Sequence, residues 1–156
     1  MTVTILLGSA SDHEVAKKAE DVLRELQIPF ETFVASAHRS PDRVDELVKK
    51  SKADVFIAIA GLTNALAGVV GARTLKPVIG VPVSGKMNLD SLLSVTQLPP
   101  GMPIAAVGLD RGENAALLAA RILALKDNSL AKRLEAWRAR QERKVIEDSK
   151  KVEATA

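Results

Sequence analysis

VFIAIAG, residues 55 to 61, holds six consecutive apolar residues followed by a glycine. A strand with one face in water alternates apolar and polar residues, whereas a strand buried on both faces is apolar throughout. PIAAVG, residues 103 to 108, has the same character. These runs predict parallel strands in a sheet that helices cover on both faces.

Five strand-like runs, each followed by a helical pattern, continue this organisation along the chain. The pairs are TVTILLG with SDHEVAKKAEDVLREL, PFETFVAS with PDRVDELVKKS, ADVFIAIAG with NALAGVVGARTL, PVIGVPVSG with LDSLLSV, and MPIAAVG with GENAALLAARILALK. We predict an α/β fold of three layers, an αβα sandwich around a parallel five-stranded sheet. The strand order 2-1-3-4-5 is expected because it is common for such sheets.

The length of 156 residues fits a single domain, residues 1–156, with a core of about 1–127 and a C-terminal helix of about 129–148. Leu130, Leu134, Trp137 and Val145 share one stripe of that helix, which has no strand left to cover. The helix either folds back on its own domain or docks onto another subunit, and we favour docking. The terminal KKVEATA is expected to fray.

Composition excludes several classes of function. The chain has no cysteine, which removes disulfides, thiolate catalysis and cysteine-bound zinc, and two histidines argue against a multi-histidine metal site. The net charge of +3 comes with only 3% aromatic residues, which argues against nucleic-acid binding. No apolar stretch reaches the roughly 18 residues of a membrane span, and no basic leader follows Met1. We expect a cytoplasmic protein without a membrane partner.

Small and polar residues follow each predicted strand, where the loops of a parallel sheet meet at one edge and ligands bind. These segments are Gly8–Asp12, Ser36–Arg39, Gly61–Asn64, Ser84–Lys86 and Gly108–Arg111. We therefore expect the functional site at this edge.

The first of these loops, GSASD, admits two compatible interpretations. A glycine before a helix N-terminus favours a phosphate, and Ser11 with Glu14 has the spacing of a capping box. The segment lacks both GxGxxG and GxxxxGK[ST], so neither a dinucleotide nor a Walker-type triphosphate site is indicated.

The second loop places His38 beside Arg39, immediately before a helix that Ser40 and Pro41 are expected to begin. Arg39 offers a planar fork for phosphate or carboxylate, and an imidazole exchanges protons near neutral pH. This pair suits acid–base chemistry on an anionic metabolite. The other histidine, His13, is expected on the surface of a helix. LPPGMP, residues 98–103, predicts a stiff turn that walls a pocket.

Several motifs in order resemble the N5-carboxyaminoimidazole ribonucleotide mutase and phosphoribosylaminoimidazole carboxylase family (PurE) of purine biosynthesis. They are GSASD, SAHRSP, AIAGLTNALAG, PVIGVPV, SVTQLPPGMP and NAALLAARIL. The resemblance implies a flavodoxin-like fold and a homo-octamer with sites near subunit interfaces. It also implies a cytoplasmic enzyme that uses a ribonucleotide and CO2 and needs no metal, biotin or ATP.

The same resemblance implies roles for individual residues. His38 would be the general acid/base, Ser9 and Asp12 would meet the ribonucleotide, and Ser36 and Arg39 would hold its phosphate. The full set of substrate-binding residues expected is Gly8, Ser9, Ser11, Asp12, Ser36, Ala37, Arg39, Gly61, Asn64 and Leu66. In the mutase reaction the carboxylated amine loses CO2, C4 of the imidazole attacks the trapped CO2, and a proton then leaves C4.

The third loop departs from both branches of the family. Ala65 stands where the bacterial type has a second histidine, and Gly61–Leu66 keeps the Asn-x-Leu of the animal type without its arginine. Three alternatives to the mutase therefore stay open: a carboxylase that uses CO2 directly, a flavodoxin-like nucleotide-binding module, and a relative without activity.

Overall fold

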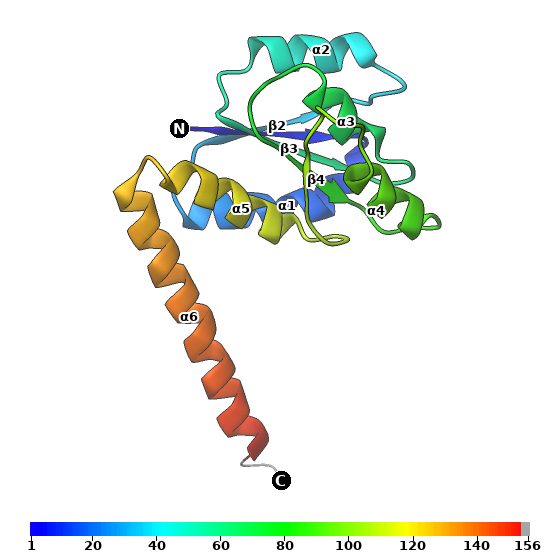
Figure 1. The fold of residues 1–156 in the computed structure, drawn as a ribbon. Coiled ribbons are helices and arrows are strands. Elements are labelled where there is room, and N and C mark those ends of the chain that lie inside the picture. The colour runs from blue at the N-terminus through cyan, green and yellow to red at the C-terminus, as the bar shows by residue number, and fades with distance from the viewer. Residues whose placement is uncertain (154–156) are drawn as a thin grey trace.

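The computed structural model describes residues 1–153 as a parallel five-stranded sheet between helices, with one long helix leaving the body (Figure 1). The strands are β1 (Val3–Leu7), β2 (Phe30–Val34), β3 (Val55–Ala60), β4 (Val78–Pro82) and β5 (Ala105–Ala106). Their order is β2-β1-β3-β4-β5, which confirms the predicted topology. Ile5 of β1 lies beside Thr32 of β2 and Ile57 of β3, so all carboxyl ends point the same way.

The helices alternate with the strands as the apolar patterns predict. They are η1 (Ala10–Asp12), α1 (His13–Glu25), α2 (Pro41–Lys50), α3 (Ala65–Gly71), α4 (Asn88–Thr96), α5 (Gly112–Ala124) and α6 (Asn128–Glu153). Ser40 is the N-cap of α2 and Pro41 its first residue, as expected. Pro fits there because the first helical N–H has no partner within the helix.

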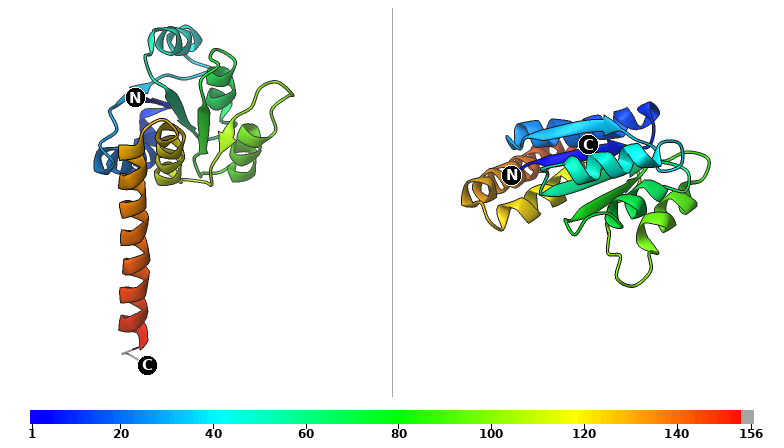
Figure 2. Two further views of the ribbon diagram at one scale, coloured as in Figure 1. Left: turned by 60° about the vertical axis from the view of Figure 1, so that its left-hand side comes forward. Right: turned by 90° about the horizontal axis from the view of Figure 1, so that it is seen from above.

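Two hydrophobic clusters lie on opposite faces of the sheet and form the three-layer sandwich. On one face, Ile5 and Ile57 pack against α1 and α5. On the other, Leu6 and Phe56 pack against α2, α3 and α4. β1 and β3 are buried along their whole length, because neighbouring strands flank both and helices cover both faces. Figure 2 shows the layers from two further sides.

The fifth strand differs from the sequence prediction. PIAAVG was expected to be as buried as VFIAIA, yet only Ala105 and Ala106 form β5 and both are exposed. β5 lies at the edge of the sheet and has one neighbouring strand, so a run of apolar residues does not guarantee burial there.

Helix α6 packs on the body only through its first turns. Leu130 is buried, and Leu134 and Trp137 pack against the cluster beneath α1 and α5. Val145, on the same predicted stripe, is 69% exposed, and the helix has left the body by that point (Figures 1 and 2). Three of the four residues of the stripe thus fold back on their own domain. Docking of the rest on another subunit stays a prediction.

The described part of α6 runs to Glu153, beyond the expected end near residue 148. Residues 150–153 of the segment expected to fray are helical, and 154–156 lie outside the described residues. Within residues 1–153, no helix combines the length and apolar character needed to cross a membrane.

Candidate active site

A pocket of about 690 Å³ opens at the carboxyl ends of β1 to β4, where the sequence predicts the site. Its volume is in the range of small-molecule sites. All the predicted residues line it: Gly8, Ser9, Ser11, Asp12, Ser36, Ala37, His38, Arg39, Gly61, Asn64 and Leu66. The structure therefore brings the whole set together, while the roles of its members stay predictions.

The floor of the pocket lies where β1 and β3 end side by side. The Gly8 amide donates a 2.9 Å hydrogen bond to the Ile59 carbonyl. A Cβ on Gly8 would lie 2.9 Å from the Cβ of Ala60, which is closer than two such atoms approach in proteins. Glycine at this position therefore allows the two strand ends to meet.

The turn after Gly8 is fixed by a reciprocal cap. The Ser9 side chain accepts from the Ser11 amide, and the Ser9 amide donates a 2.8 Å bond to Asp12 Oδ2. The predicted capping box of Ser11 and Glu14 is therefore wrong. The chain forms the short helix η1 before α1, so the capping residues come two positions earlier than the spacing indicated.

Asp12 lies at the base of this turn and is only 6% exposed. Burial raises the pKa of its carboxyl, and the Ser9 amide and the Arg39 charge oppose that rise without cancelling it. Its ionised form is stabilised by one backbone amide and a nearby guanidinium. A ligand hydroxyl reaching this carboxylate would complete its hydrogen bonding.

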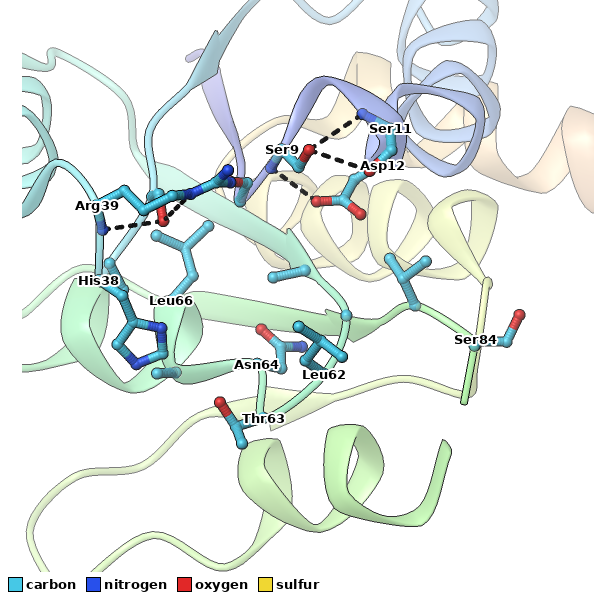
Figure 3. Close-up of a pocket in the computed structure, with 18 of the residues that line it drawn as sticks. Ser9, Ser11, Asp12, His38, Arg39, Leu62, Thr63, Asn64, Leu66 and Ser84 are labelled. Carbon is cyan, nitrogen blue, oxygen red and sulfur yellow. Dashed lines mark hydrogen bonds between the residues drawn. The ribbon is translucent and has the colours of Figure 1, made fainter. Parts of the chain in front are cut away.

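Arg39 connects the second loop to the first. Its Nη2 donates a 2.9 Å bond to the Gly8 carbonyl, and its Nε lies 3.3 Å from Ser36 Oγ (Figure 3). Ser40 Oγ in turn accepts from the Ser36 amide at 3.0 Å. The guanidinium is thus oriented before any ligand arrives, with N–H groups left for an anion.

His38 lies beside this network without joining it. Its side chain is exposed, lines the pocket, and forms no hydrogen bond with any residue of the described chain. Figure 3 shows its ring on the side of Leu66 and Asn64, away from the Ser9 turn. His13, by contrast, lies on α1 with 56% of its side chain exposed and 3.8 Å from Glu20, on the surface as predicted.

The third loop, Gly61–Asn64, adopts a costly backbone. Leu62 and Asn64 have φ angles of 52° and 36°, in the left-handed region that leucine avoids and asparagine tolerates. Asn64 is 1% exposed and donates from Nδ2 to the Val81 carbonyl at 3.1 Å. Its Oδ1 is buried and has no hydrogen-bond partner. An unpaired buried acceptor marks a place where the fold alone leaves a polar group unsatisfied.

Some lining residues were not among the predicted ones. They are Ala60, Leu62, Thr63, Ala65, Val83, Ser84, Gly85 and Lys86. The position of Ser84–Lys86 after β4 was a signal for that segment, but no motif gave it a role. The predicted wall LPPGMP does not reach this pocket, since Gly101–Pro103 line a second hollow with residues 71–78.

Comparisons with known proteins agree on one family. The model of the family described as AIRC, AIR carboxylase, matches residues 2–144. The chain is 56% identical to the N5-carboxyaminoimidazole ribonucleotide mutase of Methanocaldococcus jannaschii, covering 96% of each protein. It is 44% identical to the Bacillus subtilis protein of the same name, over 94% of this chain and 95% of that one.

A solved structure agrees with this likeness. The crystal structure of Treponema denticola PurE superposes with a TM-score of 0.87 at 32% identity, covering 96% of this chain and 97% of that one. A relative from Methanothermobacter thermautotrophicus is much longer, and this chain covers 41% of it.

Proposed function

The chain belongs to the AIR carboxylase family, and we propose that it acts as an N5-carboxyaminoimidazole ribonucleotide mutase in purine biosynthesis. One observation carries the proposal. In a chain 56% identical to a mutase of that name, His38, Arg39, Asp12 and the glycine–serine turn line a single pocket.

The reaction moves a carboxyl group from the exocyclic nitrogen to C4 of the imidazole. Cleavage of the N–C bond releases CO2, and the nitrogen takes up one proton. C4 then attacks CO2, and loss of the C4 proton restores the aromatic ring, so one proton is gained and one is lost. A histidine side chain suits both proton transfers because it exchanges protons near neutral pH. His38 has no competing hydrogen bond within the described chain and is free to turn toward either atom.

The remaining lining residues suit a ribonucleotide. The Arg39 fork and the Ser36 hydroxyl, 3.3 Å apart, offer donors to a 5′-phosphate. The Asp12 carboxylate offers an acceptor to the ribose hydroxyls. When the phosphate and the sugar are both held, the imidazole ring of the substrate is fixed relative to the His38 side chain. This favours recapture of CO2 over its escape.

The pocket opens to solvent in a single chain, and His38, which lines it, is exposed. We propose that a homo-oligomer, an octamer by resemblance, covers it, and that the exposed far half of α6 contributes to the assembly. A cytoplasmic location fits a step of nucleotide synthesis.

Product formation distinguishes the mutase from its alternatives. Purified protein is supplied with N5-carboxyaminoimidazole ribonucleotide in one arm and with aminoimidazole ribonucleotide plus bicarbonate in the other. We expect rapid formation of the C4-carboxylated product in the first arm. Faster turnover in the second arm indicates a direct carboxylase. Binding without turnover indicates an inactive relative, and tight binding of flavin mononucleotide alone indicates a nucleotide-binding module.

A further inference from the structure

The loop between β4 and α4 forms a wall of the pocket that the predicted residues do not include. Ser84, Gly85 and Lys86 all line the pocket. The Lys86 side chain is exposed and forms no hydrogen bond or ion pair with any other residue between 1 and 153. A lysine ammonium at a pocket wall, without a protein carboxylate beside it, is available to an anionic ligand.

The two cations that line the pocket follow strands on opposite sides of its floor. Arg39 follows β2 and Lys86 follows β4, with β1 and β3 between them. Three strand spacings of about 4.8 Å separate the two strands by roughly 14 Å. Arg39 is already oriented by Gly8 and Ser36. The substrate of the proposed reaction also has two anionic groups, a phosphate at one end and a carboxylate at the other.

Asp110 anchors the loop that contains Lys86, although Asp110 does not line the pocket. Its Oδ1 accepts a 2.8 Å hydrogen bond from the Ser84 amide. Its own amide donates to the Pro82 carbonyl at 2.9 Å, and Lys18 Nζ donates to its carbonyl at 3.1 Å. Asp110 adopts a φ of 58°, a left-handed conformation that aspartate tolerates better than most residues do.

The Asp110 carboxylate stays ionised to a lower pH than an ordinary aspartate does. Burial alone would raise the pKa of Asp110, but hydrogen bonds from Ser84 and the charges of Lys18 and Arg111 bring it below its usual value. Hydrogen bonds to an ionised acceptor are shorter and stronger than neutral ones. The start of the β4–α4 loop is therefore held firmly at physiological pH.

We propose that Lys86 is a further substrate-binding residue, which contacts the carboxylate that the reaction moves, and that Asp110 is a positioning residue acting on Lys86 through Ser84. The Arg39 fork and its serine hydroxyls suit the three oxygens of a phosphate, which leaves the carboxylate to the lysine. This inference rests on the proposed function.

Binding measurements test the lysine without requiring turnover. The affinities of carboxyaminoimidazole ribonucleotide, which has the carboxylate, and aminoimidazole ribonucleotide, which lacks it, are measured by calorimetry for the wild type, Lys86→Met and the control Lys52→Met. Lys52 is exposed and lies outside the pocket. We expect Lys86→Met to weaken the carboxylated ligand about tenfold or more, as for a lost charge-assisted hydrogen bond. Aminoimidazole ribonucleotide should bind to Lys86→Met with the same affinity as to the wild type.

Other outcomes overturn the assignment in distinct ways. If the affinities of both ligands fall equally, Lys86 contacts the phosphate instead. If neither affinity falls, Lys86 is not part of the binding site. If neither the wild type nor the control binds either ribonucleotide, the proposed function itself is overturned. That outcome is distinguishable from a failure of the Lys86 assignment, because it does not depend on the Lys86 variant.

Two substitutions at Asp110 separate positioning from folding. Asp110→Asn keeps an acceptor for the Ser84 amide and tolerates a positive φ, whereas Asp110→Gly tolerates that φ and loses the acceptor. We expect KM to rise several-fold in Asp110→Gly with little change in kcat, and Asp110→Asn to restore most of the loss. Glu113→Gln, a neighbouring carboxylate that contacts Arg111 instead, is the control.

The KM of a double variant distinguishes a positioning role of Asp110 from a purely structural one. If Asp110 acts through Lys86, Asp110→Gly adds little to the KM of Lys86→Met. Additive effects of the two substitutions would show that Asp110 supports the fold rather than the lysine, and would overturn its positioning role.

Discussion

The loops that line the pocket are held in two different ways. After β1 and β2, side chains bond to the backbone of the loops: Asp12 accepts from the Ser9 amide, and Arg39 donates to the Gly8 carbonyl. After β3, the loop has one buried side-chain hydrogen bond, from Asn64 to Val81, two left-handed residues and an unpaired Asn64 oxygen.

This difference separates a pre-organised wall from a strained one. Groups that hold fixed parts of a ligand benefit from being oriented in advance, because less freedom is lost on binding. Unfavourable backbone conformations persist only where the surrounding fold imposes them, and they gather at functional sites. We infer that the first two loops recognise the sugar phosphate and that the third shapes the space around the reacting ring.

The largest effect is expected at His38, which belongs to neither network. Because His38 is exposed and unbonded, His38→Asn should leave folding and assembly intact while kcat falls by roughly a hundredfold or more. Turnover and thermal unfolding measured on the same preparation check this. Near-normal turnover would remove the proposed proton transfer.

The next effect tests the pre-organised wall. Arg39→Met removes the bonds to Gly8 and Ser36 together with a charge, and we expect KM to rise about tenfold to a hundredfold. Arg43→Met is the matched control, since Arg43 donates to the Val34 carbonyl and does not line the pocket. A similar KM for both variants would mean that the Arg39 network does not bind substrate.

A smaller effect measures the cost of the strained wall. Asn64→Ala and Asn64→Gly both lose the bond to Val81, but only alanine pays the left-handed penalty of about 1 kcal/mol or more. Asn64→Ala should therefore be less stable than Asn64→Gly by about that amount, or a few degrees in Tm. Denaturant and thermal unfolding decide. Equal stabilities would show that the loop relaxes without cost.

The smallest effect concerns pH. Because the folded-state pKa of Asp12 is raised, the folded chain binds a proton in a pH window where the unfolded chain has lost it. The contribution of Asp12 to stability therefore falls as pH rises through that window. Asp12→Asn lacks this titration. The Tm of Asp12→Asn should rise relative to that of the wild type as pH increases above about 4, the ordinary pKa of an aspartate. A constant difference would contradict the raised pKa.

The fold was predictable because the strand signals were unambiguous. VFIAIA is buried along its length, and five strand-to-helix units left few topologies for a parallel sheet. The exposure of Ala105 and Ala106 was not predictable from composition, since edge and central strands differ by their neighbours rather than by their residues.

The candidate site was predictable as a set of loops but not as a set of contacts. Residues after parallel strands meet at one edge, so Gly8 and Arg39 were expected to be close. The contact of Asp110 with Ser84 joins two loops that no motif connects. Likewise, nothing in the letters GLTN shows that Asn64 adopts a positive φ or that its oxygen lacks a partner.

The close approach of Gly8 to Ala60 also sets the breadth of the pocket. A methyl group at position 8 would push the ends of β1 and β3 apart. The Gly8 carbonyl, which Arg39 contacts, would then lie farther from β3 and β4. The distance across the pocket, from the Arg39 side to the Lys86 side, therefore depends on the absence of a single carbon atom at position 8.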